Sequence, residues 1–296
     1  MTNLIFAFMQ AYGGDERESL LLSHSLRRFG GKLANHPLWL MMPEKLEQVS
    51  EATLRELEEL GVQVHRFEVP KEALHFPFGG KVYAAAAAEE LASEKSDVLV
   101  WMDSDTVFAG EPSDFILGEN ISLGYRPVML KNISSLYDEP VNAFWSLMFE
   151  RCETPVDHIF PMLTTIDRVR IHPQFNAGMI SLHPEKQLLR TWRNNFERLY
   201  QQPELTQFYQ EHVLYRIFVH QAILSATLLT MLQQGETYDL GSGFNFPMFL
   251  VSAPELAHEA VTLRYDEFKF FEQAGWEEKV DLNESFLNWL QTQAGA

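Results

Sequence analysis

The carboxylates of Asp103 and Asp105 are the side chains in this sequence best placed to do chemistry. They follow an apolar run, 98–102, that has the length of a buried strand. Side chains two residues apart on an extended chain point the same way, so both carboxylates can face one ligand at the carboxyl end of that strand. Two acidic oxygen donors suit Mg²⁺ or Mn²⁺. The pattern therefore predicts a divalent-cation site, against the alternative of an Asx-turn that only ends the strand.

The segments that precede this motif alternate between strand and helix signals. Strand-like runs cover 4–9, 37–42 and 62–69, and helical periods cover 16–29, 44–60 and 81–94. Repeated βα units predict a mostly parallel sheet with helices on both faces. The second half is less regular, and there we expect strands at 121–126, 175–182 and 262–265 and helices at 141–151, 184–201, 213–233 and 284–290.

The composition excludes several classes of protein. A formal net charge of -18 argues against a nucleic-acid binder and against an anionic membrane surface. Cys152 is the only cysteine, so an intrachain disulfide and a cysteine-based zinc site are excluded. No uninterrupted apolar run approaches the roughly 18 residues that a membrane span needs, and no secretory signal precedes the first strand. We therefore expect a protein without a transmembrane segment, located in the cytoplasm.

The motif 103–107 also fits a second chemistry. Asp-Ser-Asp-Thr-Val matches the DxDx(T/V) pattern of haloacid-dehalogenase-like phosphatases, in which the first Asp is the nucleophile. That family places the motif on its first strand and completes its metal site with a later acidic pair. Here three predicted strands precede the motif and no such pair follows. A phosphohydrolase is therefore the less favoured alternative.

The order of motifs resembles the GT-A nucleotide-sugar glycosyltransferases, and within them glycosyltransferase family 8, the glycogenin-like and lipopolysaccharide galactosyltransferase-like group. In that class the DxD motif follows a nucleotide-binding half, as it does here. The strand 175–178, Phe-Asn-Ala-Gly, looks like the family's FNxG strand. His220-Gln221 resembles the start of its DQxxLN helix, and Asn245-Phe246-Pro247 resembles its late YNxP loop.

This resemblance implies a GT-A-like three-layer α/β/α sandwich with a mostly parallel mixed sheet. It implies one domain over 1–296, with a nucleotide-binding half at 1–110, a donor-sugar and acceptor half at 111–270 and a tail at 271–296. The reaction would move a sugar from a nucleotide-diphosphate sugar, a UDP-sugar being favoured, to a saccharide, lipid-linked or protein-linked acceptor. Mn²⁺ or Mg²⁺ would neutralise the charge that develops on the leaving diphosphate. A non-catalytic nucleotide-sugar or glycan-binding protein on the same fold stays open as an alternative.

The resemblance also implies roles for individual residues. Asp103 and Asp105 would hold the metal, and Asn176 would hydrogen-bond hydroxyl groups of the donor. His220 and Gln221 would be catalytic, with Gln221 beside the anomeric carbon. Donor binding would use Tyr12, Lys81, Asp103, Ser104, Asn176, Gly178, Arg264 and Lys269.

Three of these residues carry arguments of their own. Lys81 stands at a predicted helix start, where a cation is unfavourable unless an anion binds there. His220 stands where the family has Asp, so it would act as a base, contact the sugar or simply pack in the core. Arg264 stands where the family has a metal-ligating His. Arginine has no acceptor atom, so we expect Arg264 to contact the phosphates while Asp266 or a water completes the metal shell. The alternatives are weak metal dependence, loss of catalysis, or ordinary surface charge at Arg264 and Lys269.

Overall fold

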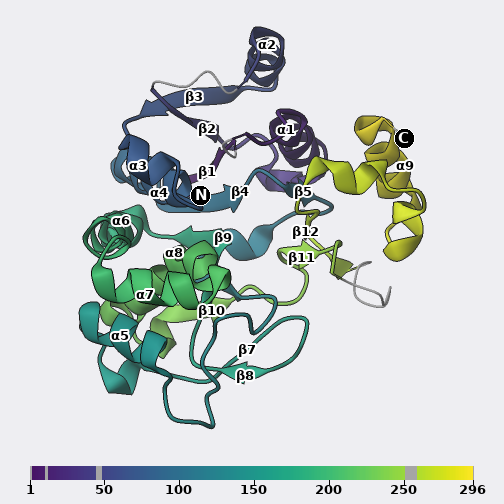
Figure 1. Ribbon diagram of the computed structural model, residues 1–296. Helices are drawn as coiled ribbons and strands as arrows, with labels where there is room; N and C mark the ends of the chain where they lie inside the picture. The colour runs from purple at the N-terminus through teal and green to yellow at the C-terminus, as the bar shows by residue number, and fades with distance from the viewer. Residues whose placement is uncertain (1, 11–12, 45–48, 251–258, 296) are drawn as a thin grey trace.

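A computed structural model describes residues 2–10, 13–44, 49–250 and 259–295. Its centre is a seven-stranded sheet in the order β10-β6-β9-β4-β1-β2-β3 (Figure 1). β4, β1, β2 and β3 are mutually parallel, β9 runs antiparallel between β4 and β6, and β10 is parallel to β6. The mostly parallel mixed sheet expected from the sequence is therefore confirmed. The strands are β1 Leu4–Met9, β2 Leu38–Pro43, β3 Val62–Phe67, β4 Val98–Asp103, β6 Leu123–Pro127, β9 Phe175–Leu182 and β10 Thr237–Asp239.

Helices cover both faces of this sheet because its central strands are apolar on both sides. Leu4, Phe6 and Phe8 of β1 pack with α1 (Arg17–Phe29) and α2 (Glu51–Glu59), and the alternate residues of β1 pack with α4 (Gly79–Ala92). Alternation along a strand sends neighbouring side chains to opposite faces. α6 (Leu188–Leu199) packs on α4, and α8 (Val213–Met231) packs on α6 and β9. The result is the three-layer α/β/α sandwich.

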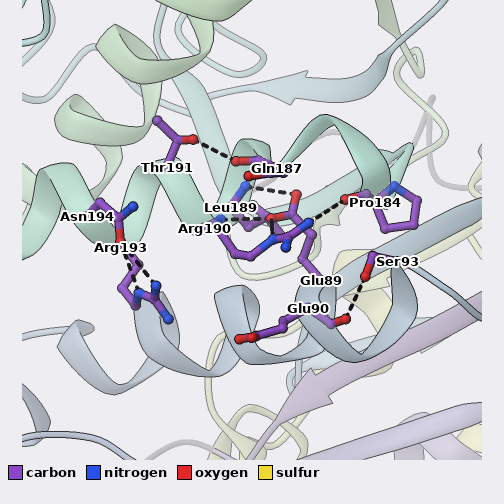
Figure 2. Close-up of polar contacts among 10 residues, drawn as sticks. All are labelled: Glu89, Glu90, Ser93, Pro184, Gln187, Leu189, Arg190, Thr191, Arg193 and Asn194. Atoms are coloured by element: carbon purple, nitrogen blue, oxygen red, sulfur yellow. Dashed lines mark hydrogen bonds and ion pairs between the residues drawn. The ribbon is translucent and has the colours of Figure 1, made fainter.

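A buried carboxylate joins α4 to α6 (Figure 2). Glu89 of α4 is fully buried and accepts the backbone N–H groups of Leu189 and Arg190 at 3.0 and 2.8 Å, and Arg190 Nε adds a contact of 3.3 Å. The first N–H groups of a helix have no partner within the helix, and Gln187, the N-cap of α6, makes no side-chain cap. Burial raises the pKa of Glu89 in spite of these donors. Glu89 thus caps α6 from a different helix and fixes the helical layer.

A second, three-stranded sheet continues the chain beyond the two aspartates. It contains β5 (Thr106–Phe108), β12 (Thr262–Arg264) and β11 (Phe246–Pro247), with β12 in the middle. β12 runs antiparallel to β5, which places Arg264 opposite Thr106. The C-terminal segment, yellow in Figure 1, lies beside α1, where Phe286 of α9 (Glu284–Ala294) packs edge-on against Phe29 at 5.0 Å. This small sheet brings late residues of the chain to the end of β4.

The other α-helices and strands are short and lie outside the two sheets described above. They are α3 Lys71–Leu74, α5 Ala143–Arg151, α7 Pro203–Glu211, β7 Met162–Leu163 and β8 Arg170–Ile171. The sequence predicted α5 but not α3 or α7. α2 begins at Glu51, later than the predicted 44, because Ser50 caps it by accepting the Thr53 N–H group. α8 is long and apolar enough to cross a membrane, but 61% of that stretch is buried inside the protein, as in the core helix of a globular fold.

Candidate functional site

A cavity of about 850 Å³ opens at the carboxyl ends of β1 and β4. β2 and β3 lie on one side of β1 and β4 lies on the other, so the strand order reverses here. In open α/β sheets such a switch point is where ligands bind. The lining comes from the N-terminal end of α1, the loop before α4, the end of β4 and the segment after β12. Its polar members include Asp15, Arg17, Glu18, Lys81, Asp103, Ser104, Asp105, Arg216, Arg264, Asp266, Glu267, Lys269 and Glu272.

The two aspartates face one group, and that group is a guanidinium. Arg264 Nε lies 2.7 Å from Asp105 Oδ2, and Arg264 Nη2 lies 3.2 Å from Asp103 Oδ2. Lys81 Nζ lies 2.5 Å from Asp103 Oδ1. Both carboxylates and Arg264 are mostly buried, with side-chain exposures of 10%, 6% and 17%. The structure thus brings Lys81 and Arg264 together with the predicted pair.

These contacts set the charge states of the cluster. Burial would raise the pKa of Asp103, but Lys81 and Arg264 together hold that pKa below its ordinary value. Burial raises the pKa of Asp105, with Asp103 adding to the rise and Arg264 opposing it. Burial would lower the pKa of Arg264, but Asp105 and Asp103 hold that pKa above its ordinary value. Asp103 and Arg264 therefore form a charged pair in a site largely shielded from water.

This donor set does not fit the divalent cation that the sequence predicted. Asp103 Oδ2 and Asp105 Oδ1 are buried without hydrogen bonds, so each has a lone pair to offer. However, both carboxylates already face cations, and each unit of added positive charge 4 Å from the guanidinium costs about 4 kcal/mol at an effective dielectric constant of 20. Within the described ranges, no three His, Cys, Asp or Glu side chains form a metal-binding group. Asp266, expected as the third ligand unless a water took that place, is solvent-exposed at the cavity lining.

Gly178 provides the space that the Asp103 carboxylate occupies. β9 runs antiparallel beside β4, and a Cβ on Gly178 would lie 2.4 Å from Asp103 Oδ2 and 3.0 Å from Asn176 Oδ1. Asn176 Oδ1 accepts the Gly178 N–H group at 2.8 Å. The glycine of the FNAG strand is therefore required by close packing beside the carboxylate, and Asn176 is engaged within its own strand.

Glu18 is a member of the site that the sequence interpretation missed. Ser104 Oγ, between the two aspartates, donates a hydrogen bond to Glu18 Oε2 at 2.7 Å. Burial raises the pKa of Glu18 to about 7, and the nearby Asp105 adds to the rise. The available signal was helical spacing: Glu18 lies three and four residues before Leu21 and Leu22, on the buried face of α1.

His220 and Gln221 are buried near the start of the covered part of α8. His220 Nδ1 lies 2.9 Å from the Ile217 carbonyl oxygen, and its ring stacks on Phe78 with centroids 4.6 Å apart. Burial lowers the pKa of His220 to about 3, so the ring is neutral. Gln221 Oε1 accepts the Ala177 N–H group at 3.1 Å. Neither residue, nor Asn176, is among the described residues that line the cavity.

Phe78 connects this buried group to the cavity, and the sequence interpretation did not include it. Its ring lines the cavity, is 42% exposed, and lies 4.8 Å from Lys81 Nζ. Its backbone is left-handed, with φ of 58°, a conformation that bulky side chains rarely adopt. Strain of this kind persists where surrounding contacts impose it, and it is concentrated at functional sites.

Two further residues, Lys269 and Arg216, line the cavity. Lys269 is 71% exposed at the rim and pairs with Glu267. Arg216, which sequence reasoning did not select, lines the cavity with its guanidinium 5.2 Å from the Phe76 ring centroid. Tyr12 lies outside the described residues.

Comparison with known proteins identifies the family. Residues 6–226 match the family described as the Rhodobacterales glycosyltransferase domain. The chain belongs to this family of glycosyltransferases. No curated protein matches the glycosyltransferase at the sequence level.

Solved structures show what fold this glycosyltransferase has. The galactosyltransferase LgtC, solved in complex with donor and acceptor sugar analogs, aligns with a TM-score of 0.50 at 13% identity, over 99% of this chain and 95% of that one. Mouse xyloside xylosyltransferase 1, in its apo form, aligns with a TM-score of 0.43 at 16% identity, over 83% of this chain and 87% of that one. The likeness to LgtC shows the GT-A fold, and the expectation of a GT-A-like glycosyltransferase is confirmed.

Proposed function

We propose that this glycosyltransferase moves a sugar from a nucleotide-diphosphate sugar, a UDP-sugar in the first place, to a saccharide that is free, lipid-linked or protein-linked. One observation carries the proposal. The cavity at the switch point of the sheet holds Lys81 and Arg264 against the paired aspartates at the end of β4. Two cations at such an edge suit the diphosphate of a donor, because charge-assisted hydrogen bonds to phosphate oxygens are strong and directional.

The diphosphate side of the reaction follows from these cations. A nucleoside diphosphate leaves readily only when its developing negative charge is stabilised by fixed positive groups in a site with little water. Lys81 and Arg264 are held in place by Asp103 and Asp105 before any ligand binds. Arg216 also lines the cavity and supplies a third positive group.

The sugar of the donor is expected to lie against the ring of Phe78, which forms an aromatic wall of the cavity. Phe78 presents an exposed face beside Lys81, and an aromatic face suits the apolar side of a pyranose ring. Asp105 Oδ1, buried and without a hydrogen bond, is an acceptor for a donor hydroxyl group. His220 stacks on Phe78. The catalytic roles of His220 and Gln221 and the donor-binding role of Asn176 remain predictions.

Other expectations from the sequence belong to the same proposal. The divisions at 1–110, 111–270 and 271–296, the cytoplasmic location and the donor-binding roles of Tyr12, Ser104 and Lys269 remain predictions. The sequence also predicts Mn²⁺ or Mg²⁺, but the donor set at Asp103 and Asp105 does not fit a divalent ion in addition to Arg264.

A thermal-shift panel tests the function. Nucleoside diphosphates and nucleotide sugars are compared, each with Mn²⁺ and with EDTA, and the best donor is then assayed for hydrolysis and for transfer to saccharide acceptors. We expect one diphosphate base and its sugar conjugate to raise the melting temperature and the conjugate to be turned over. Binding without turnover of any conjugate would favour the non-catalytic alternative, and no shift with any member would reject the donor class.

A further inference from the structure

We propose that Arg264, together with Lys81, takes the place of the divalent cation in this protein, so that the diphosphate of the donor binds without a metal ion. The proposal rests on the proposed function for the identity of the ligand. Its other half, that Asp103 and Asp105 hold an arginine in place of a metal, does not depend on the ligand.

The backbone fixes the position of Arg264. β12 pairs with β5 so that Arg264 is opposite Thr106, the residue directly after Asp105. The next residue, Tyr265, donates its N–H group to the Asp105 carbonyl oxygen at 3.3 Å. The guanidinium therefore reaches the two carboxylates from a neighbouring strand of the same sheet, and not from a long surface loop.

The contacts use the guanidinium as a bridge between the carboxylates. Nε contacts Asp105 at 2.7 Å and Nη2 contacts Asp103 at 3.2 Å. Neither contact uses Nη1. Arginine carries five N–H donors in a rigid plane, so it can hold two carboxylates on one side and still present donors to phosphate oxygens.

The charges of the cluster support the same assignment. Two carboxylates and one divalent cation sum to zero. Ionised Asp103 and Asp105 with Lys81 and Arg264 also sum to zero, and ion pairs link the four groups in the order Lys81, Asp103, Arg264, Asp105. The cluster therefore reaches, with side chains alone, the neutrality that a divalent ion would otherwise supply. A divalent ion at the same carboxylates would have to displace Arg264, leaving a buried cation without a partner.

A direct metal-binding measurement tests the cation site. Mn²⁺ is titrated into the protein alone and followed by electron paramagnetic resonance, for the wild type and for Arg264→His. We expect no stoichiometric Mn²⁺ binding by the wild type and a bound signal in Arg264→His, because imidazole can ligate a metal and arginine cannot. A wild-type site that binds Mn²⁺ and is lost in Asp105→Asn would overturn the proposal.

A second measurement tests the ligand side. UDP and uridine affinities are measured by calorimetry in EDTA and in Mn²⁺, for the wild type, Arg264→Gln and the control Arg151→Gln, whose guanidinium forms an exposed pair with Glu204. We expect wild-type UDP affinity to be the same in both conditions, and Arg264→Gln to weaken UDP by about tenfold or more in EDTA with little effect on uridine. Circular dichroism confirms that the variants are folded.

The outcomes separate the two proposals. UDP binding that appears only with Mn²⁺ overturns the metal-free assignment and leaves the donor class intact. An equal loss of UDP and uridine affinity in Arg264→Gln means that Arg264 supports the structure and not the diphosphate. If no nucleoside diphosphate binds in either condition, the proposed donor is wrong, and the Mn²⁺ titration still decides whether the aspartates hold a metal.

Discussion

Arg264 and Asp105 form a buried ion pair across 159 residues of sequence, with 2.7 Å between Nε and Oδ2. Asp105 directly precedes β5, and Arg264 ends β12 beside it. Because the pair is largely removed from water, each partner depends on the other for compensation of its charge. Changes to this pair are therefore expected to alter both the free energy of unfolding and the affinity for an anionic donor.

We predict that Arg264→Gln lowers the free energy of unfolding by about 3 kcal/mol, because it leaves two buried carboxylates with one fewer cation. The double variant Arg264→Gln/Asp105→Asn should lose less free energy of unfolding than Arg264→Gln and Asp105→Asn lose in total as single variants. Urea denaturation measures all three. Arg170→Gln, which breaks an exposed pair with Asp138, is the control and should cost no more than about 0.5 kcal/mol. Strict additivity of the two single losses would contradict a direct interaction.

Gly178→Ala should disturb the aspartate pair from the neighbouring strand. The new methyl group would lie 2.4 Å from Asp103 Oδ2, and Lys81 holds the other oxygen of that carboxylate. We expect a loss of stability of about 1–3 kcal/mol together with weaker UDP binding. The control is Gly118→Ala, since a Cβ at Gly118 meets no atom within 4 Å. Unchanged UDP affinity in Gly178→Ala would show that the carboxylate position is not critical for the donor.

Glu18 should make the stability of the protein depend on pH. Its folded pKa of about 7 is above the ordinary 4.5, because Glu18 is buried and because Asp105, Asp15 and Asp103 lie nearby. A raised carboxyl pKa stabilises the fold fully below pH 4.5, and this contribution is lost as the pH rises to 7. The free energy of unfolding of Glu18→Gln should therefore equal that of the wild type near pH 4.5. At pH 8 it should exceed the wild-type value by about 3 kcal/mol.

Urea denaturation at pH 5, 6, 7 and 8 checks this prediction. Glutamine can still accept the Ser104 hydrogen bond, so the variant changes charge and preserves geometry. Glu51→Gln, at an exposed position, serves as the control. Its free energy of unfolding should change with pH in the same way as that of the wild type. If the free energy of unfolding of Glu18→Gln also changes with pH as that of the wild type does, the folded pKa of Glu18 is not raised.

His220 and Gln221 are predicted to affect transfer more than donor binding. We expect His220→Ala and Gln221→Ala to reduce transfer or donor hydrolysis by about tenfold or more while UDP affinity changes far less, because His220 contacts Phe78 and Gln221 contacts the Ala177 N–H group of β9, away from the two cations proposed to bind the diphosphate. The pKa of His220 is about 3, so its protonation should produce no inflection near pH 6.5 in the rate profile. An equal loss of UDP affinity would assign both residues to general folding.

A third variant separates the two readings of His220. His220→Phe preserves the stacking on Phe78, whose ring lies 4.6 Å away, and removes the ring nitrogens. Activity that survives this change assigns His220 to holding Phe78 in position. Activity lost in both His220→Ala and His220→Phe, with UDP affinity kept, assigns a role to the imidazole itself.

The sequence alone determined the features that depend on neighbouring residues. The apolar run ending at Asp103 became β4, and the predicted strand 175–182 became β9 with the same bounds. The βα order predicted the parallel half of the sheet, and the two-residue spacing predicted that Asp103 and Asp105 face one group. Periodicity and strand alternation are local properties, so they can be read without knowing what packs against them.

Only the tertiary structure decided that the group facing Asp103 and Asp105 is the guanidinium of Arg264. Lys81 meets Asp103 because α4 begins beside the end of β4, and Arg264 meets Asp105 because β12 inserts next to β5. Glu18 becomes a site residue through burial under Ser104, and α2 begins late because Ser50 caps it. Each of these outcomes depends on which distant elements become neighbours and on how far they exclude water. Charge pairing and pKa follow from that proximity and desolvation, which no local pattern in the sequence specifies.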